Sequence, residues 1–284
     1  EIVKRLKKAG NKGVVVSGID NIAVQEVILA INTYLGSKVI DVTQPKFVRK
    51  GSNSEVVKLL SDIKSGEVKG LITVGINPGF TLPNADEFLA AVKKLELSAA
   101  FALKEDETAA VAQFIGPTSH YLESWGDYEF KKGHFALAQP TIKPLFDTRQ
   151  FQDVLLKLMK TETNYHQEIK SFWEKNILLE KTWNKSLHDG FLSTDVTIES
   201  ISPEINVSDQ INSLSASTSK GLSLVLYTKT GMGDGQQANN PWLQEFPDPI
   251  SRISWDNYLT ISAIDAKEIG LKNINVSNGA LNGS

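Results

Sequence analysis

The first half of the chain alternates short apolar runs with stretches of helical spacing. Apolar runs typical of buried parallel strands occupy residues 13–18, 39–42, 71–74, 97–103 and 111–115. Between them, apolar residues recur every three or four positions, as on one face of a helix: Val24, Val27, Ile28, Ile31 and Leu35; Val56, Leu59, Leu60 and Ile63; Phe88, Leu89, Val92 and Leu95. This order predicts an α/β domain over residues 1–147, with a parallel sheet and helices on both faces.

The pattern changes near residue 148. Helical spacing continues over residues 151–159 and 165–177, and residues 191–220 are rich in Ser, Thr and Asn. Residues 148–220 are therefore predicted to form a helical and loop-rich insertion. In the third part, residues 221–284, strands are predicted at 222–227 and 258–262 and a short helix at 263–269.

Composition excludes several classes of function. The 284 residues carry a formal net charge of -3 and no dense Lys/Arg cluster, so a nucleic-acid partner is not expected. The chain has no cysteine, so this stretch cannot form a disulfide, a zinc thiolate site or an iron–sulfur cluster. No apolar stretch approaches the roughly 18 residues of a membrane-spanning helix. The start without Met, and an end on turn residues, predict a segment of a longer protein.

One loop is the main candidate for a binding site. In doubly wound sheets, ligands bind beyond the carboxyl ends of the strands. Residues 75–79, Gly-Ile-Asn-Pro-Gly, follow the predicted strand 71–74. Small residues there let a phosphate or sugar approach the backbone N–H groups, and the proline fixes a turn. Gly75, Asn77 and Pro78 are therefore the candidate cofactor-binding residues, and the alternative is an ordinary strand-to-loop turn.

Three other patterns favour structural interpretations. Gly231–Gly235 lacks the lysine and the following helix of a phosphate-binding loop, which favours a flexible loop. Residues 120–127 contain His, Glu and Asp that could serve acid–base chemistry, but packing by their aromatic neighbours is favoured. The four histidines show no paired metal spacing; they are His120, His134, His166 and His188. No catalytic residue and no metal ligand is predicted.

Several of these pieces, taken together, resemble the molybdopterin oxidoreductases. Residues 75–78 with 83–88 resemble the family's G-x-N-P segment, and residues 108–117 resemble its T-A-x-x-A-D-V-V-L-P stretch. Glu123 and Gly126 fit the E-x-x-G that follows, and residues 264–270 resemble the opening of the family's C-terminal β-barrel. The resemblance implies a Rossmann-like domain at 1–147 and a truncated barrel start at 221–284. It also implies that Gly75, Asn77 and Pro78 lie near the guanosine diphosphate part of the dinucleotide cofactor.

A narrower resemblance concerns one subgroup. Residues 120–127, 139–146 and 239–250 resemble the molybdopterin-like iron–sulfur subunit of alternative complex III, a bacterial quinol:cytochrome c oxidoreductase. Two departures from the wider family bear on cofactor binding. Gln113 stands where many family enzymes have Asp, and Gly116 where they have Leu. The family's cluster-binding cysteines and its molybdenum ligand have no counterpart in this chain.

These resemblances leave two functions open. The first is a non-catalytic scaffold in a respiratory electron-transfer complex on the periplasmic side of the bacterial inner membrane. It would have lost its pterin, with cytochrome c-type and cluster-bearing parts as partners and iron–sulfur clusters only outside this segment. The alternative is the dinucleotide-binding part of an active molybdenum or tungsten oxidoreductase of the polysulfide- or thiosulfate-reductase type. That part would bind molybdopterin guanine dinucleotide. A free-standing nucleotide-binding module fits the second half of the chain less well.

Overall fold

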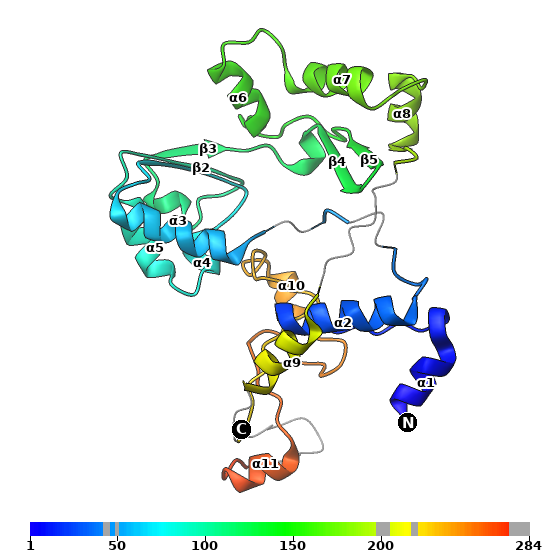
Figure 1. Ribbon diagram of the computed structural model, residues 1–284. Helices are drawn as coiled ribbons and strands as arrows, with labels where there is room; N and C mark the ends of the chain where they lie inside the picture. Colours follow the sequence, from blue (N-terminus) through cyan, green and yellow to red (C-terminus); the bar gives the residue numbers. More distant parts are fainter. Residues whose placement is uncertain (42–45, 49–50, 197–204, 217–220, 273–284) are drawn as a thin grey trace. The chain divides into compact units, whose positions relative to one another are not determined.

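The computed structural model describes residues 1–41, 46–48, 51–196, 205–216 and 221–272 (Figure 1). The chain divides into two compact units, Glu1–Val225 and Leu226–Ser284. Within the described residues, no helix has the length and apolar character needed to cross a membrane.

A three-stranded parallel sheet forms the centre of the predicted α/β region. Its strands are β1 (Gly70–Val74), β2 (Leu97–Ala102) and β3 (Phe114–Pro117), adjacent in that order. Helices α3 (Asn53–Ser65) and α5 (Ala85–Val92) pack on the face of the sheet to which Leu71 points. Their buried core consists of Leu60, Ile63, Phe88, Ala91, Val92 and Leu95. The α/β class with a helix-flanked parallel sheet is confirmed.

Local sequence signals explain where α3 begins and ends. The Ser52 side chain accepts a hydrogen bond from the Glu55 backbone N–H, which caps the first turn. Gly66 adopts a left-handed conformation with φ 82°, which ends the helix at low steric cost. Between these two caps lies the apolar face of α3, from which Leu60 and Ile63 pack into the core.

A second, antiparallel sheet follows in the chain. Strands β4 (Gly126–Lys131), β5 (His134–Ala138) and β6 (Phe191–Ser193) pair in the order β4-β5-β6. Helices α6 (Phe151–Leu158), α7 (Tyr165–Asn176) and α8 (Trp183–Asp189) lie between β5 and β6 in sequence. Trp173, fully buried, lies in a core with Ile169, Ile177, Leu178, Trp183 and Leu192. The two helices predicted at 151–159 and 165–177 are confirmed.

The two predicted N-terminal strands are wrong within the described residues. Residues 13–18 pair with no strand, and residues 39–41 are bends and loop; Val42 lies outside the described residues. The Asn32 side chain of α2 (Ile22–Leu35) binds both backbone groups of Val15, its Oδ1 and Nδ2 each at 2.8 Å. The Asn32 amide thus satisfies the backbone N–H and C=O of Val15, as a neighbouring strand would, because it offers one donor and one acceptor.

The fifth predicted strand is shifted. Residues 109–111 form a 3₁₀ turn, and the strand is β3 at 114–117. Ala109 is completely buried within that turn, so its small apolar side chain packs in the core although these residues pair with no strand.

The strands predicted in residues 221–284 are also wrong within the described residues. Residues 222–227 and 258–262 form no strand, and the described residues form no closed barrel. Leu224, Val225 and Leu226 are largely exposed, since no neighbouring strand covers them. The helix predicted at 263–269 is confirmed as α11 (Ala263–Glu268). The remaining elements are α1 (Ile2–Ala9), α4 (Pro78–Thr81), α9 (Val207–Ala216), α10 (Pro241–Glu245), and the 3₁₀ turns Gly10–Lys12 and Tyr121–Glu123.

Phe88→Ala is expected to destabilise the chain by about 3–5 kcal/mol, because it leaves a cavity between α3 and α5. The Phe88 side chain is 4% exposed, whereas Phe80 is 48% exposed, so Phe80→Ala is the matched control. Chemical denaturation followed by fluorescence measures both. Equal losses of unfolding free energy in the two variants would contradict this assignment of the core.

Candidate functional site

A cleft of about 260 Å³ opens at the carboxyl end of the parallel sheet. Val74 and Gly75, at the end of β1, and Thr118, just after β3, form part of its wall. The cleft lies at the edge where doubly wound sheets bind ligands. The aromatic lining consists of Tyr121, Trp125, Tyr128, Phe151 and Tyr165, and the polar lining of Thr118, Ser119, Ser124, Asp127, Gln150 and Gln152.

Gly75 turns the chain away from β1 at the rim of this cleft. Its backbone has φ 64°, in the left-handed region, and its N–H donates to the Phe101 carbonyl at 2.9 Å. A Cβ atom at this position would meet nothing within 4 Å. The glycine is therefore required by the backbone conformation and not by a close neighbour.

Asn77 joins the loop after β1 to the loop after β2. Its Oδ1 accepts from the Thr108 hydroxyl at 2.8 Å and from the Thr108 N–H at 3.2 Å, and its Nδ2 donates to Glu107 at 2.6 Å. The buried Thr108 hydroxyl in turn accepts from the Gly79 N–H at 2.9 Å. The Asn77 hydrogen bond lowers the pKa of Glu107 below its ordinary value. The stabilisation from this carboxylate is therefore present above its ordinary pKa and is lost as the pH falls through the lowered value.

The three candidate cofactor-binding residues thus have different environments. Gly75 lines the cleft, whereas Asn77 and Pro78 are not among its lining residues. Pro78 is the first residue of α4, a position that suits its fixed φ and missing N–H. Their role in holding a cofactor stays a prediction.

Residues 120–127 use their polar groups in local hydrogen bonds. The Glu123 carboxylate accepts from the backbone N–H groups of Leu145 and His120, each at 3.0 Å, and these bonds, the one from Leu145 most, lower its pKa. Nδ1 of His120 accepts from the Leu122 N–H at 3.3 Å. These hydrogen bonds agree with the structural interpretation of these groups. The expected packing of Tyr121 is wrong, because its side chain is largely exposed.

Asp127, on the wall of the cleft, links β4 to α7. Its two carboxylate oxygens accept from the Tyr165 hydroxyl at 3.2 Å and from the Trp173 indole N–H at 3.1 Å. Burial raises the pKa of Tyr165 to about 12, with further contributions from the charge and hydrogen bond of Asp127. Trp125, also on the cleft wall, stacks on the His166 ring with 4.1 Å between centroids. Nε2 of His166 is buried and has no hydrogen-bond partner among the described residues.

Sequence reasoning missed the cleft residues contributed after residue 147. Gln150, Phe151, Gln152 and Tyr165 line the cleft, yet they belong to the part predicted as an insertion. The helical stripe that begins at Phe151 was a usable signal. It shows that Phe151 faces inward but does not show what it faces; in the structure its ring meets Phe101 of β2 edge-on at 4.7 Å.

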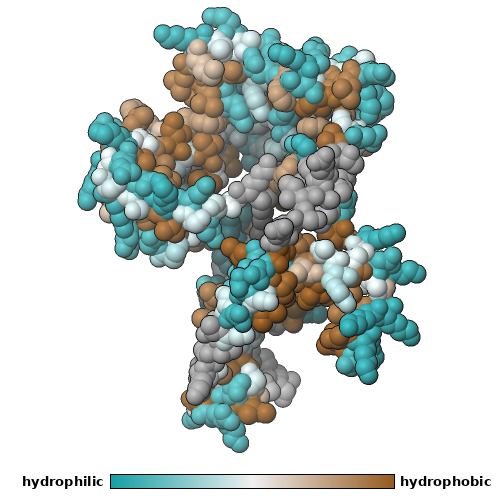
Figure 2. Space-filling view, viewed as in Figure 1, coloured by the Kyte–Doolittle hydropathy of each residue, from teal (hydrophilic) through white to brown (hydrophobic). Residues whose placement is uncertain are grey.

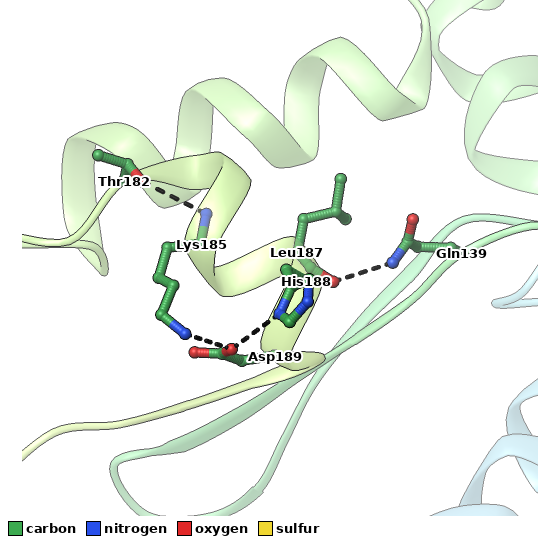
Figure 3. Close-up of polar contacts among 6 residues, drawn as sticks. All are labelled: Gln139, Thr182, Lys185, Leu187, His188 and Asp189. Atoms are coloured by element: carbon green, nitrogen blue, oxygen red, sulfur yellow. Dashed lines mark hydrogen bonds and ion pairs between the residues drawn. The ribbon is translucent and has the colours of Figure 1, made fainter.

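The histidines remain separate from one another. On α8, His188 contacts Asp189 at 3.2 Å, while Lys185 pairs with the same carboxylate at 2.6 Å (Figure 3). The Gln139 amide donates to the Leu187 carbonyl at 3.0 Å, which ties the end of β5 to this helix. In the described parts of the chain, no group of three or more His, Asp or Glu residues could hold a metal ion.

The Gly231–Gly235 loop forms consecutive turns in the second unit. A Cβ atom on Gly231 would lie 3.1 Å from the Phe246 ring. This close approach gives the first glycine a packing role, and the absence of a following helix at residues 236–239 agrees with the loop interpretation.

Two curated proteins are similar to part of this chain, while no family model matches it. The assimilatory nitrate reductase catalytic subunit of Bacillus subtilis is 32% identical over 103 residues, which are 36% of this chain and 14% of that protein. The menaquinone reductase molybdopterin-binding-like subunit of Nitratidesulfovibrio vulgaris is 32% identical over 105 residues, 34% of this chain and 15% of that protein. The matched part is thus about one seventh of each relative.

Among solved structures, acetylene hydratase from Pelobacter acetylenicus aligns with a TM-score of 0.41 and 15% identity, covering 49% of this chain and 21% of that one. The two sequence relatives indicate a molybdopterin-oxidoreductase-like segment.

Tyr165 is expected to ionise late in an alkaline titration. Its neutral form is favoured in the fold, so the stability it contributes is complete below its ordinary pKa of 10.0 and declines as the pH rises towards 12. Asp127→Asn should lower this pKa while leaving it above the ordinary value, because burial is the largest cause. Tyrosinate absorbance of the wild type minus that of Tyr165→Phe isolates the group, and Tyr121→Phe should leave the late phase unchanged. An unaltered Tyr165 titration in Asp127→Asn would refute the coupling.

Proposed function

We propose that this chain is a non-catalytic scaffold segment of a molybdopterin-oxidoreductase-like subunit that binds no pterin. The cleft lining carries the argument. The cleft at the carboxyl end of β1 contains no Lys, Arg or His among its described lining residues, and its one charged group is the carboxylate of Asp127. A dinucleotide cofactor carries a diphosphate, which proteins hold with cations or free backbone N–H groups. A neutral to acidic lining disfavours such an anion.

The hydrogen bonds that the Asn77 side chain already makes support the same proposal. Its amide oxygen accepts two hydrogen bonds from Thr108, and its amide nitrogen donates to Glu107. A cofactor that used this side chain would have to compete with these bonds and leave the Thr108 hydroxyl, which is buried, in need of a new partner.

The two departures from the family pattern have structural roles that fit a scaffold. The Gln113 side chain accepts from the Ser98 N–H and donates to the Leu95 carbonyl, joining β3 to the start of β2. An aspartate could not donate the second bond. A Cβ atom on Gly116 would lie 2.5 Å from the Phe101 ring, so a leucine there would force that ring to move.

The partner subunits and the location that we propose for such a scaffold rest on its similarity to other proteins. One relative is named as a molybdopterin-binding-like subunit of a menaquinone reductase. This supports a multi-subunit respiratory complex for the present chain. We propose the quinol:cytochrome c oxidoreductase type from the resemblance of residues 120–127, 139–146 and 239–250 alone. We place it on the periplasmic side of the bacterial inner membrane, beside cytochrome c-type and cluster-bearing parts. Iron–sulfur clusters would lie only outside this segment, which has no cysteine.

An enzymatic role is the second candidate. It is favoured by the cleft itself, which is open and has Gly75 at its rim, and by the relative named as a catalytic subunit. In that case the segment would form the dinucleotide-binding part of a molybdenum or tungsten oxidoreductase of the polysulfide- or thiosulfate-reductase type. Gly75, Asn77 and Pro78 would line molybdopterin guanine dinucleotide, which would supply the redox metal centre.

Metal and pterin analysis of the whole native protein separates the two proposals. Elemental analysis for molybdenum and tungsten, and fluorescence of the oxidised pterin, are expected to find far less than one equivalent per chain. A molybdenum enzyme purified in parallel from the same cells shows that the cells supply the cofactor. One equivalent of metal and pterin per chain would overturn the scaffold proposal and support the enzyme.

A further inference from the structure

The cleft at the end of the parallel sheet contains an unbalanced negative charge. Asp127 is half-buried on its wall, and its two side-chain donors, the Tyr165 hydroxyl and the Trp173 indole, are both neutral. Asp153 accepts from the Tyr165 N–H at 2.7 Å, so a second carboxylate lies near the same tyrosine. In the part of the chain that the structure describes, neither carboxylate forms an ion pair. A partly buried charge without a counterion is costly, so the cleft favours a cation.

The polar neighbours of the cleft do not balance this charge. Arg149 directs its guanidinium to Asp147 at 2.6 Å and to the Thr148 carbonyl at 2.7 Å, and it is not a lining residue. The Gln150 amide lines the cleft but is already in use. It donates to the Trp125 carbonyl at 2.6 Å and accepts from the Trp125 N–H at 3.2 Å. A counterion would therefore have to come from a ligand.

Aromatic rings line the same cleft and are accessible. Tyr121 and Tyr128 are 71% and 58% exposed, and a Cβ atom on Gly126 would lie 2.7 Å from the Tyr128 hydroxyl, so the glycine leaves room for that side chain. Hydrophobic side chains also reach the surface around the parallel sheet that forms one wall (Figure 2). Among the described residues, no Lys or Arg lies over a ring of the cleft. An open ring face attracts a cation, and more strongly where water is excluded.

These features favour a guanidinium group as the ligand. A guanidinium is planar and weakly hydrated, stacks on aromatic rings and pairs with a carboxylate through two N–H groups. Each Asp127 oxygen accepts one bond from a side chain and keeps a lone pair for another. The cleft volume of about 260 Å³ lies below the roughly 300–1,000 Å³ of pockets for drug-sized ligands, so it suits one side chain or a small cation. A metal ion is not favoured, because the described residues offer no group of three or more ligands.

We propose that the cleft binds a guanidinium group, with the Asp127 carboxylate as its counterion and the rings of Tyr121 and Tyr128 beside it. The group belongs either to an arginine of a neighbouring polypeptide or to a small free molecule, and the binding experiment separates these two sources. The inference rests on the proposed absence of a pterin from the cleft. A protein that contains no pterin and also binds no guanidinium compound would refute this inference alone.

Titration calorimetry of the whole native protein at low ionic strength tests the ligand class. N-acetyl-arginine methylamide imitates an arginine within a polypeptide, and N-acetyl-citrulline methylamide is its neutral counterpart of nearly the same shape. The arginine compound should bind at least about tenfold more tightly, because the neutral group forms no ion pair with Asp127. Tighter binding of free arginine than of the blocked compound would assign the site to a free molecule, and equal or weaker binding to a polypeptide. Equal binding of the arginine and citrulline compounds, or binding of neither, would overturn the proposal.

Single substitutions locate the site. Asp127→Asn keeps an oxygen for Tyr165 but removes the charge, so it should weaken binding of the arginine compound at least about tenfold. Because Asp127 also supports the fold, Tyr121→Ala is the second variant, and the loss of one exposed ring should weaken binding about two- to fivefold. Tyr34→Ala, at a similarly exposed tyrosine of α2, should leave binding unchanged. Unchanged affinity in both Asp127→Asn and Tyr121→Ala would exclude this cleft as the binding site.

Discussion

The amide of Asn77 holds the carboxyl end of the parallel sheet in one arrangement. Without Asn77, the loops that follow β1 and β2 would leave the buried Thr108 hydroxyl without an acceptor for its proton. Asn77 meets this need, since an amide side chain can accept two bonds from Thr108 and still donate to Glu107. A larger residue at Gly79 would force its neighbours to shift, because a Cβ would lie 2.7 Å from the end of the Leu89 side chain and 3.1 Å from Thr108. The position of Gly75 at the rim of the cleft depends on this fixed loop.

A second polar group fixes the opposite wall. The Asp127 carboxylate accepts from Tyr165 and Trp173, so strand β4 and helix α7 are joined by hydrogen bonds as well as by apolar packing. Trp173 has no exposed surface, so its indole N–H would be costly to leave unpaired. Asp127 therefore serves the architecture, and its presence in the cleft makes the site still less suitable for a diphosphate.

Periodicity predicted the elements that bury a clear stripe. The helices around Leu60, Phe88 and Trp173 and the strands 71–74 and 97–102 follow from apolar spacing. It failed for residues 13–18 and 222–227, because an apolar run specifies a strand only where another strand supplies its hydrogen bonds. Of the site, the sequence indicated Gly75 and the sheet edge. It could not indicate Tyr165 or Gln150, since their place on the cleft wall depends on packing across distant segments.

Gln113 and Gly116 differ from the residues at these positions in the molybdopterin oxidoreductases that the chain resembles. At the level of sequence, Gln113 and Gly116 count against dinucleotide binding only as missing matches. In the structure both residues have a defined role, since Gln113 ties β3 to β2 through a donor that aspartate lacks, and Gly116 leaves space for the Phe101 ring. That ring packs edge-on against Phe151, which lines the cleft. The substitution at 116 is thus coupled to the cleft wall through two aromatic rings. A leucine at this position, as in the molybdopterin oxidoreductases that the chain resembles, would require a rearrangement of the wall, so Gly116 and the shape of the cleft belong to one packing solution.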